Sequence, residues 1–160
     1  MNRLPLILSL LIVVMIVTAC NDDSCEGNGS SLPLAAFYVG DKQQAIYGLT
    51  IKGIGAPGDS VLYSGAAISE AYLPLRASTT STSYALTRQY INGQDTLLVK
   101  DTLTLDYEPV AYFHSQECGA MFNFDIKRVA CTDNCIDSVV LLTTLVTNSR
   151  TPAMRIHFTE

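Results

Sequence analysis

The residues that most resemble catalytic machinery form one short cluster, His114-Ser115-Gln116-Glu117, which combines a base, a hydroxyl and a carboxylate. Neighbouring residues of a strand point to opposite faces, whereas a hydrolytic triad is assembled from distant segments. The second histidine, His157, falls on the outward side of an alternating strand, where a solvated histidine is expected. We therefore predict no catalytic residues and no enzyme activity. The alternative is an exported hydrolase with a site near His114 and Glu117.

Two further patterns could hold a ligand, and neither has the context that such a site needs. Gly53 to Gly58 matches the dinucleotide motif G-x-G-x-x-G, which requires a helix to begin there and face a pyrophosphate. Pro57-Gly58-Asp59 instead predicts a turn before another strand. Asp133, Asn134 and Asp137 offer oxygen atoms to calcium, but they are fewer than a dedicated loop supplies. We predict neither a cofactor nor a metal ion.

The beginning of the chain has the pattern of an export signal. Arg3 precedes an apolar run from Leu4 to Val17, which is shorter than the roughly 20 residues of a membrane-spanning helix. The run ends in Val17-Thr18-Ala19-Cys20, which resembles the bacterial lipobox, where a cysteine thiol receives a diacylglycerol before cleavage. The resemblance implies a signal peptide over residues 1–19 and lipid attachment at Cys20, so that the protein contacts a membrane through its lipid anchor.

A polar, glycine-rich stretch follows Cys20 and predicts a flexible tether over residues 20–33. Asp22 and Asp23 resemble the acidic export signal of some surface-exposed Bacteroidota lipoproteins. We expect an outer-membrane lipoprotein of the cell envelope, with the periplasmic and the surface-facing orientations both open. The net charge is −5 and becomes more negative when Arg3 leaves with the signal, so the chain is repelled by phosphate backbones. Nucleic acid is therefore excluded as a partner.

The remaining cysteines are an even set in an exported chain and are candidates for disulfide bonds: Cys25, Cys118, Cys131 and Cys135. The sequence alone leaves all three pairings open. Cys-Thr-Asp-Asn-Cys reads as two strand ends around a three-residue turn, which favours Cys131–Cys135 and leaves Cys25 for Cys118. Zinc is the competing use, but tetrahedral sites usually need two Cys-x₂₋₄-Cys pairs and only one is present.

From Leu34 onward, apolar and polar residues alternate with a period of two, which predicts half-buried strands and no helix. Val139 to Val146 is apolar on both faces and predicts a central strand that is covered on two sides. Many short strands favour an all-β domain over residues 34–160, a two-sheet antiparallel sandwich of which the immunoglobulin-like arrangement is one form. Leu34 to Val39 is a short apolar run, and Ile46 to Ile54 alternates, with Tyr47, Leu49 and Ile51 expected on the buried face. Further alternating runs begin at Leu103, Phe122 and Met154, and turns are expected at Pro57-Gly58, Ser64-Gly65, Asn92-Gly93, Lys100-Asp101 and Asn148-Ser149.

Seven short stretches follow one another in a recognisable order: Cys20 to Cys25, Gly53-Ile-Gly55, Asp59-Ser-Val-Leu-Tyr63, Leu73-Pro-Leu75, Asp101 to Tyr107, Glu117-Cys-Gly119 and Ile136 to Val139. In this order they resemble a family of small Bacteroidota lipoproteins of unknown function. The resemblance implies a β-rich envelope lipoprotein and assigns no catalytic or binding residue, and the pair Cys131 and Cys135 does not belong to the pattern.

The same resemblance makes four hydroxyl residues candidates for O-glycosylation, because Bacteroidota modify Ser or Thr after Asp in exported proteins. Turns that begin strands explain the same dipeptides equally well. The candidates are Ser60, Thr96, Thr102 and Ser138. For the protein as a whole, we expect a lipid-anchored, non-catalytic binding or scaffolding module whose partner is another envelope protein or a glycan.

Overall fold

The computed structural model describes residues 31–93, 95–116 and 118–159, and of Asp59, Asn92 and His114 it describes the backbone alone. The expected signal peptide, the lipid-attachment residue Cys20 and nearly all of the tether lie outside the described residues. The described chain consists of strands and one 3-10 turn. In chain order these are β1 (Leu34–Val39), β2 (Lys42–Gln43), β3 (Ile46–Ile54), η1 (Pro57–Asp59), β4 (Val61–Ile68), β5 (Glu70–Tyr72), β6 (Ser81–Asn92), β7 (Asp95–Ser115), β8 (Gly119–Cys131), β9 (Ile136–Leu141), β10 (Leu145–Val146) and β11 (Met154–Phe158).

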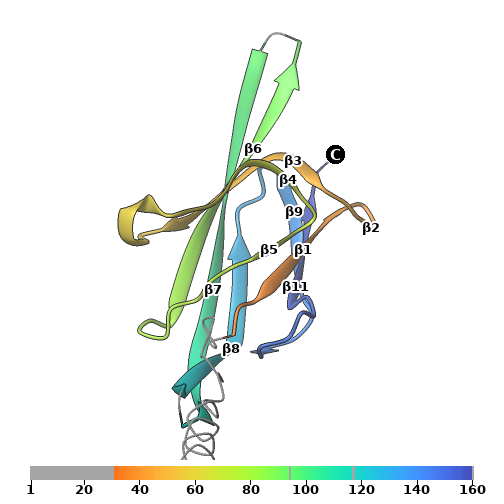
Figure 1. The fold of residues 1–160 in the computed structure, drawn as a ribbon. Helices are drawn as coiled ribbons and strands as arrows, with labels where there is room; N and C mark the ends of the chain where they lie inside the picture. The colour runs from red at the N-terminus through yellow and green to blue at the C-terminus, as the bar shows by residue number, and fades with distance from the viewer. Residues whose placement is uncertain (1–30, 94, 117, 160) are drawn as a thin grey trace, which may run out of the picture.

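The strands form two sheets, which enclose the core between them (Figure 1). One sheet has the order β2-β1-β11-β9, with β5 also paired to β1. The other has the order β10-β8-β7-β6-β3-β4, is antiparallel throughout and curls like half of a barrel. The expectation of an all-β, two-sheet domain is confirmed.

The expectation that both sheets are antiparallel is wrong. β1 and β11 run parallel, with Ala35 opposite Met154 and Val39 opposite Phe158, so the first sheet is mixed. The error has a simple cause, because alternation of apolar and polar residues reports which face of a strand is buried and says nothing about its direction. The immunoglobulin-like arrangement stays a prediction.

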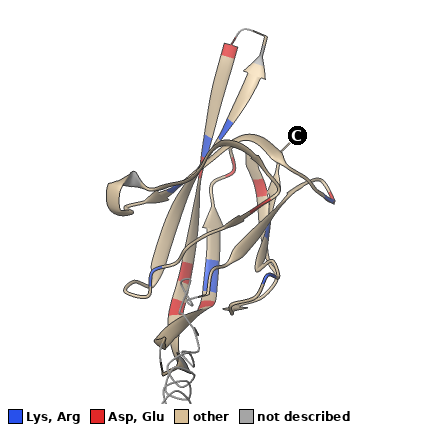
Figure 2. Cartoon of the chain, viewed as in Figure 1, with Lys and Arg blue, Asp and Glu red and all other residues tan. Residues whose placement is uncertain are grey.

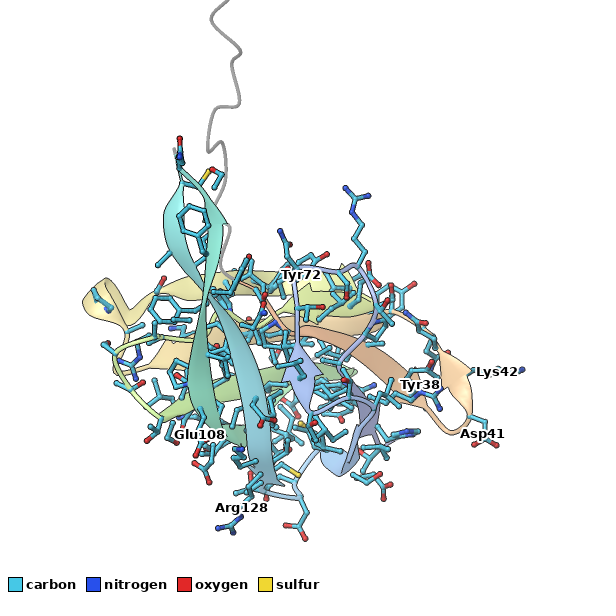
Figure 3. The ribbon with its side chains drawn as sticks, turned by 90° about the horizontal axis from the view of Figure 1, so that it is seen from below. Tyr38, Asp41, Lys42, Tyr72, Glu108 and Arg128 are labelled. Atoms are coloured by element: carbon cyan, nitrogen blue, oxygen red, sulfur yellow. The ribbon has the colours of Figure 1, made fainter. Side chains whose placement is uncertain are left out.

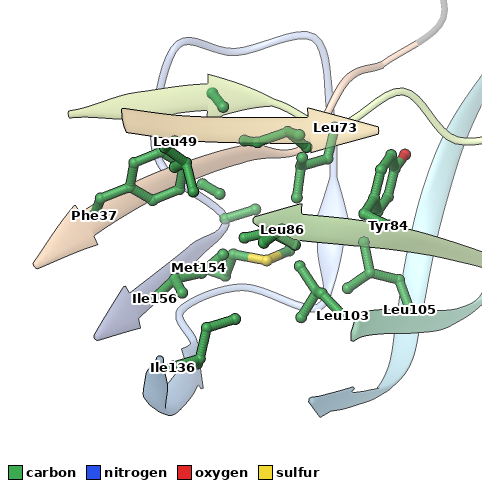
Figure 4. Close-up of a cluster of buried hydrophobic side chains, with 14 of the residues drawn as sticks. Phe37, Leu49, Leu73, Tyr84, Leu86, Leu103, Leu105, Ile136, Met154 and Ile156 are labelled. Carbon is green, nitrogen blue, oxygen red and sulfur yellow. The ribbon is translucent and has the colours of Figure 1, made fainter. Parts of the chain in front are cut away.

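The core is built from the alternating faces that the sequence indicates. Leu103, Leu105 and Tyr107 of β7 are buried and face the other sheet, where Met154 and Ile156 of β11 lie (Figure 4). Burying each such side chain stabilises the fold by about 1.5–3 kcal/mol. The intervening residues of both strands are exposed or half-buried.

Strand β7 runs the length of the molecule and belongs to two hairpins (Figure 1). It pairs with β6 from Asp95 to Asp106 and with β8 from Leu103 to Ser115. The turn between β6 and β7 lies at the expected Asn92-Gly93, and Gly93 has the positive φ of 67° that a tight hairpin requires. Because the two pairings overlap only in the middle of β7, each hairpin extends past the body at its own end.

Three local expectations are wrong, and backbone irregularity explains two of them. Tyr47 was expected to face the core with Leu49, but a bulge around Gly48 shifts the alternation and leaves Tyr47 exposed. Ser64-Gly65 is also a bulge, inside β4, rather than a turn. The run from Val139 to Val146 does not form one central strand, because the chain leaves β9 at the edge of one sheet and enters β10 at the edge of the other.

The expected turn at Lys100-Asp101 is wrong as well, because Asp101 lies inside β7 with its side chain on the core face and 1% exposed. One carboxylate oxygen accepts hydrogen bonds from the Thr132 hydroxyl at 2.5 Å and from the Asn134 backbone and side-chain nitrogens at 2.9 Å. The other accepts from the backbone N–H groups of Cys135 at 2.6 Å and Ile136 at 2.9 Å. Asp101 therefore fixes the segment from Thr132 to Ile136, which crosses from β8 in one sheet to β9 in the other.

The hydrogen bonds to Asp101 favour the ionised form of its carboxyl group. Desolvation on burial raises the pKa of Asp101, but the hydrogen bonds from Thr132, Asn134 and Cys135 outweigh it and hold the pKa well below its usual range. Each hydrogen bond to the charged form favours ionisation, since it is stronger to a carboxylate than to a neutral acid.

The predicted Cys131–Cys135 disulfide is wrong, because both residues are free thiols. The three residues between them do not form a hairpin turn. They carry the chain from β8 in one sheet to β9 in the other, and the Cys135 amide is bound to Asp101. No disulfide joins two described cysteines, whereas Cys118 is disulfide-bonded and its predicted partner, Cys25, lies outside the described residues.

We predict that Asp101→Asn lowers the free energy of unfolding by about 3 kcal/mol or more at pH 7, because an amide cannot accept all of these hydrogen bonds. The matched control is Asp106→Asn on the outward face of the same strand, where the carboxylate accepts one hydrogen bond, from Ser81 at 2.8 Å. Urea unfolding of both variants measures the difference, and equal losses would contradict the prediction.

The same residue predicts the acid response. A carboxyl group whose folded pKa is lowered stabilises the fold above its unfolded pKa of about 3.9, and this stabilisation is lost as the pH falls below that value toward the folded pKa. Wild-type stability should therefore fall more steeply below about pH 4 than that of Asp101→Asn.

Candidate binding surfaces

The structure does not bring the histidines together. The backbone of His114 lies near the end of β7, whereas His157 lies in β11 of the other sheet, and Glu117 lies outside the described residues. The Ser115 hydroxyl accepts a hydrogen bond from the Cys118 backbone nitrogen at 3.1 Å. Nδ1 of His157 lies 3.1 Å from the Gly40 carbonyl, and its ring stacks on Tyr38 at 5.3 Å. The outward position of His157 is confirmed, and its contacts belong to the β1–β2 turn.

Asn134 and Asp137, two of the candidate calcium ligands, form hydrogen bonds within the protein that indicate structural roles. The Asn134 amide donates to the Lys100 carbonyl at 3.0 Å and to Asp101, and Asp137 accepts from Ser138 at 3.1 Å. Among the residues that the structure describes, no group of three His, Cys, Asp or Glu side chains is arranged to hold a metal ion.

The free thiols do not resemble activated nucleophiles. Desolvation by burial, a hydrogen bond to Asp101 and the charge of that residue raise the pKa of the Cys135 thiol to about 12. Burial also raises the pKa of Cys131, and Asp101 and Asp133 add to the effect. Because the thiolate is the reactive form, both residues are expected to be inert at neutral pH.

The candidate glycosylation positions differ in exposure. Ser60 after η1 and Thr96 at the start of β7 are exposed, whereas Thr102 and Ser138 are half-buried within β7 and β9. Accessibility therefore favours Ser60 and Thr96 as acceptors of a bulky glycan.

Three of the quoted sequence stretches meet at one small pocket. The G-x-G-x-x-G segment forms β3 and the short turn η1 rather than a helix, so no dinucleotide site is built there. The pocket has a volume of about 220 Å³ and an apolar lining that includes Ile54, Leu62 and Leu75. Its polar lining residues are Ser60, Arg76, Thr82 and Tyr84. It is lined by neither histidine, cysteine nor carboxylate among the described side chains.

Two tyrosines fix the wall of this pocket. The Tyr84 hydroxyl donates to the Pro74 carbonyl, and burial followed by the neighbouring Tyr107 raises the pKa of Tyr84 above its usual range. The Tyr107 hydroxyl donates to the Arg76 carbonyl at 3.0 Å, accepts from the Arg76 amide at 3.1 Å and lies 2.7 Å from the Thr82 hydroxyl. Both tyrosine hydroxyls form hydrogen bonds with backbone groups of the loop between β5 and β6. They are therefore not directed at a ligand, and the pocket is chiefly an apolar recess.

A second surface lies at the β6–β7 turn, where the hairpin projects beyond both sheets (Figure 1). We call this the distal ribbon and define it as residues 89–92 and 95–99. Three large aliphatic side chains on it are unusually exposed: Ile91 at 77%, Leu97 at 60% and Leu98 at 63%. Leu97 and Leu98 are adjacent and therefore point to opposite faces, so the ribbon is apolar on both sides.

The distal ribbon also offers unpaired backbone. β3 pairs with β6 only up to Arg88, and β8 pairs with β7 only from Leu103 onward. Beyond those residues, both outer edges of the hairpin carry N–H and C=O groups without a strand partner among the described residues. Exposed edges beside apolar side chains are the features that strand-adding partners use.

Sequence reasoning missed the distal ribbon, although a signal was present. Alternation stops near the Asn92-Gly93 turn, where Tyr90-Ile91 and Leu97-Leu98-Val99 place apolar residues on both faces. A surface hairpin normally keeps one face polar, so this pattern makes the ribbon a candidate binding surface.

No helix within the described part of the chain is long and apolar enough to span a membrane. Comparison with known proteins gives no match among curated proteins and none among solved structures. A family model covers residues 48–158, which include the distal ribbon, the pocket and the Asp101 crossing. The chain therefore belongs to the family described as a family of unknown function, DUF6452.

Proposed function

We propose that the protein is a lipid-anchored, non-catalytic binding module of the cell envelope, which engages another envelope protein through the distal ribbon. The observation that supports this most is the exposure of Ile91, Leu97 and Leu98 on a hairpin that extends past the core. These side chains contribute little to folding while they face water, so their burial is available to a partner.

The chemistry of the ribbon favours a protein over a glycan. Sugar rings bind most often on flat aromatic faces, whereas the exposed tip carries aliphatic side chains and two open strand edges. A partner strand can pair with either edge and bury the neighbouring leucine or isoleucine. Asp95, near the turn, is the one charged residue of the ribbon, and Arg88 and Lys100 lie just outside it. Figure 2 shows acidic colour near the turn of this hairpin and basic colour farther along both strands.

The hydrolase alternative has less support. The apolar pocket lies beside β3 and β6, away from the end of β7 that carries His114. Its tyrosine has a raised pKa and donates to a carbonyl, so it is poorly suited to act as a base. The family assignment adds no activity, because the family's function is unknown.

We predict that a photo-crosslinking amino acid at Leu97 or Leu98, introduced in cells, gives one dominant crosslinked protein. Ile91→Asp should reduce that crosslink at least about tenfold, because a buried carboxylate without a partner opposes docking. The matched control is a crosslinker at Val140, which is 45% exposed but lies in β9 of the other sheet. The same crosslinked protein from Val140, or an undiminished yield in Ile91→Asp, would contradict the assignment of the ribbon.

We predict that His114→Ala and Glu117→Gln leave the ribbon crosslink and the cellular role unchanged. The reason is that the proposal gives neither residue a part in binding. Thermal unfolding and protein abundance are measured in parallel. A lost phenotype with unchanged stability and an intact crosslink would support the hydrolase alternative instead.

We predict that Cys20→Ala yields an unprocessed or released protein, because lipid attachment and cleavage both depend on that thiol in a lipobox. Membrane fractionation followed by mass spectrometry of the N-terminal peptide measures both events. Cys135→Ala serves as the control, since Cys135 is a buried free thiol. A processed, membrane-bound Cys20→Ala protein would contradict lipid anchoring.

A further inference from the structure

We propose that the opposite end of the molecule is a second membrane contact, in which the outer part of the β7–β8 hairpin rests in the interfacial layer of a lipid bilayer. We call this surface the proximal tip and define it as residues 109–113 and 120–122. The inference rests on the lipid anchoring in the proposed function and goes beyond it, because it assigns an orientation to the domain.

The proximal tip is apolar on both faces. Phe113 is 71% exposed, Val110 is 43% exposed, and they lie three residues apart in β7, so they point to opposite sides. Ala111 and Ala120 add exposed small apolar side chains. Exposed apolar side chains gathered at one end of a hairpin are typical of a surface that binds a partner or a membrane.

Charge is nearly absent from this end of the hairpin. Between residues 109 and 123, the sequence contains one Asp, Glu, Lys or Arg, which is Glu117. The charged side chains of the two strands begin beyond the tip, where Glu108 pairs with Lys127 at 3.1 Å and Arg128 lies opposite Asp106. Figure 3 shows Glu108 and Arg128 on the side of the hairpin away from the tip, and Figure 2 shows the tip largely without charge.

The proximal tip is also the part of the domain at which the N-terminal segment arrives. The Ser31 backbone nitrogen donates to the Phe122 carbonyl at 2.8 Å, and the Ser31 hydroxyl donates to Asn123 at 2.7 Å. Ten residues separate Ser31 from Cys20, so an acylated Cys20 lies within about 40 Å of this contact. With the predicted Cys25–Cys118 bond, five residues would span about 18 Å to the tip.

The other end of β7 is held away from the anchor. Phe113 and Leu97 are sixteen residues apart in one continuous strand, which at about 3.3 Å per residue separates them by about 50 Å. Because the lipid anchor proposed at Cys20 lies within chain reach of the proximal tip, a bilayer surface is the partner that we expect this tip to contact. An exposed aromatic side chain such as Phe113 suits the boundary between acyl chains and headgroups.

The backbone of the tip permits shallow insertion. β7 and β8 remain paired from Leu103 out to Ser115 opposite Gly119, so most of the inward-facing N–H and C=O groups are satisfied by the ladder. The outer edges still need water or headgroups, which limits the depth to the interface rather than the hydrocarbon centre.

The test uses the fact that the chain contains no tryptophan, so a single substitution introduces a unique fluorescent probe. Full-length Phe113→Trp protein, purified with its lipid, is reconstituted into phosphatidylcholine vesicles with and without acyl-chain bromination. We expect the emission to shift to shorter wavelength on vesicles and to fall at least twofold with brominated lipid. Leu97→Trp on the distal ribbon is the matched control and should show neither change.

Two results would overturn the proposal. In the first, the Phe113→Trp emission is the same with plain and with brominated vesicles. In the second, the Leu97→Trp emission is quenched as strongly as that of Phe113→Trp, which would mean that the domain lies flat on the membrane. Val110→Trp repeats the measurement if Phe113→Trp fails to fold. Mass spectrometry of the same sample reports the lipid on Cys20, and its absence would remove the basis of the proposal. An unquenched tip with an intact ribbon crosslink would overturn this inference alone and leave the proposed function standing.

Discussion

The buried carboxylate of Asp101 is the interaction on which the rest of the structure depends. It gathers five hydrogen bonds from residues 132 to 136, where the chain leaves one sheet and enters the other. A crossing of this kind brings several backbone N–H groups into the interior, and a single ionised side chain satisfies those of Asn134, Cys135 and Ile136. Asp101 of β7 therefore fixes one of the connections by which the chain passes between the two sheets.

Because β7 is long, it carries a hairpin past the core at each end of the molecule. Its central part is fixed by strands on both sides and by the core, whereas each end has only one hairpin partner. A two-stranded ribbon is weakly stable alone, but here both ribbons continue from a packed sheet. The fold can therefore hold apolar side chains far from the core at either end, which a globular domain with short strands could not do.

Much of the fold could be predicted because burial leaves a period of two, as in Leu103, Leu105 and Tyr107 or Met154, Ile156 and Phe158. The same pattern failed at Tyr47, where a bulge resets the alternation, and at Cys131 and Cys135, whose short spacing resembled a hairpin. Asp101 shares its phase with Leu103, so a carboxylate on an apolar face was visible in the sequence. Its partners were not visible, because they come from a segment about thirty residues away.

The parallel pairing of β1 with β11 has a consequence for how the domain forms. Ala35 finds its neighbour Met154 only when the last strand is present, so the mixed sheet cannot be completed on a growing chain. Closing so long a loop carries an entropic cost before any contact repays it, which slows folding in proteins rich in distant pairings. Until β11 pairs with β1, the curled sheet would expose Leu49, Leu86 and Leu105, which are buried in the folded domain and favour aggregation when they face water.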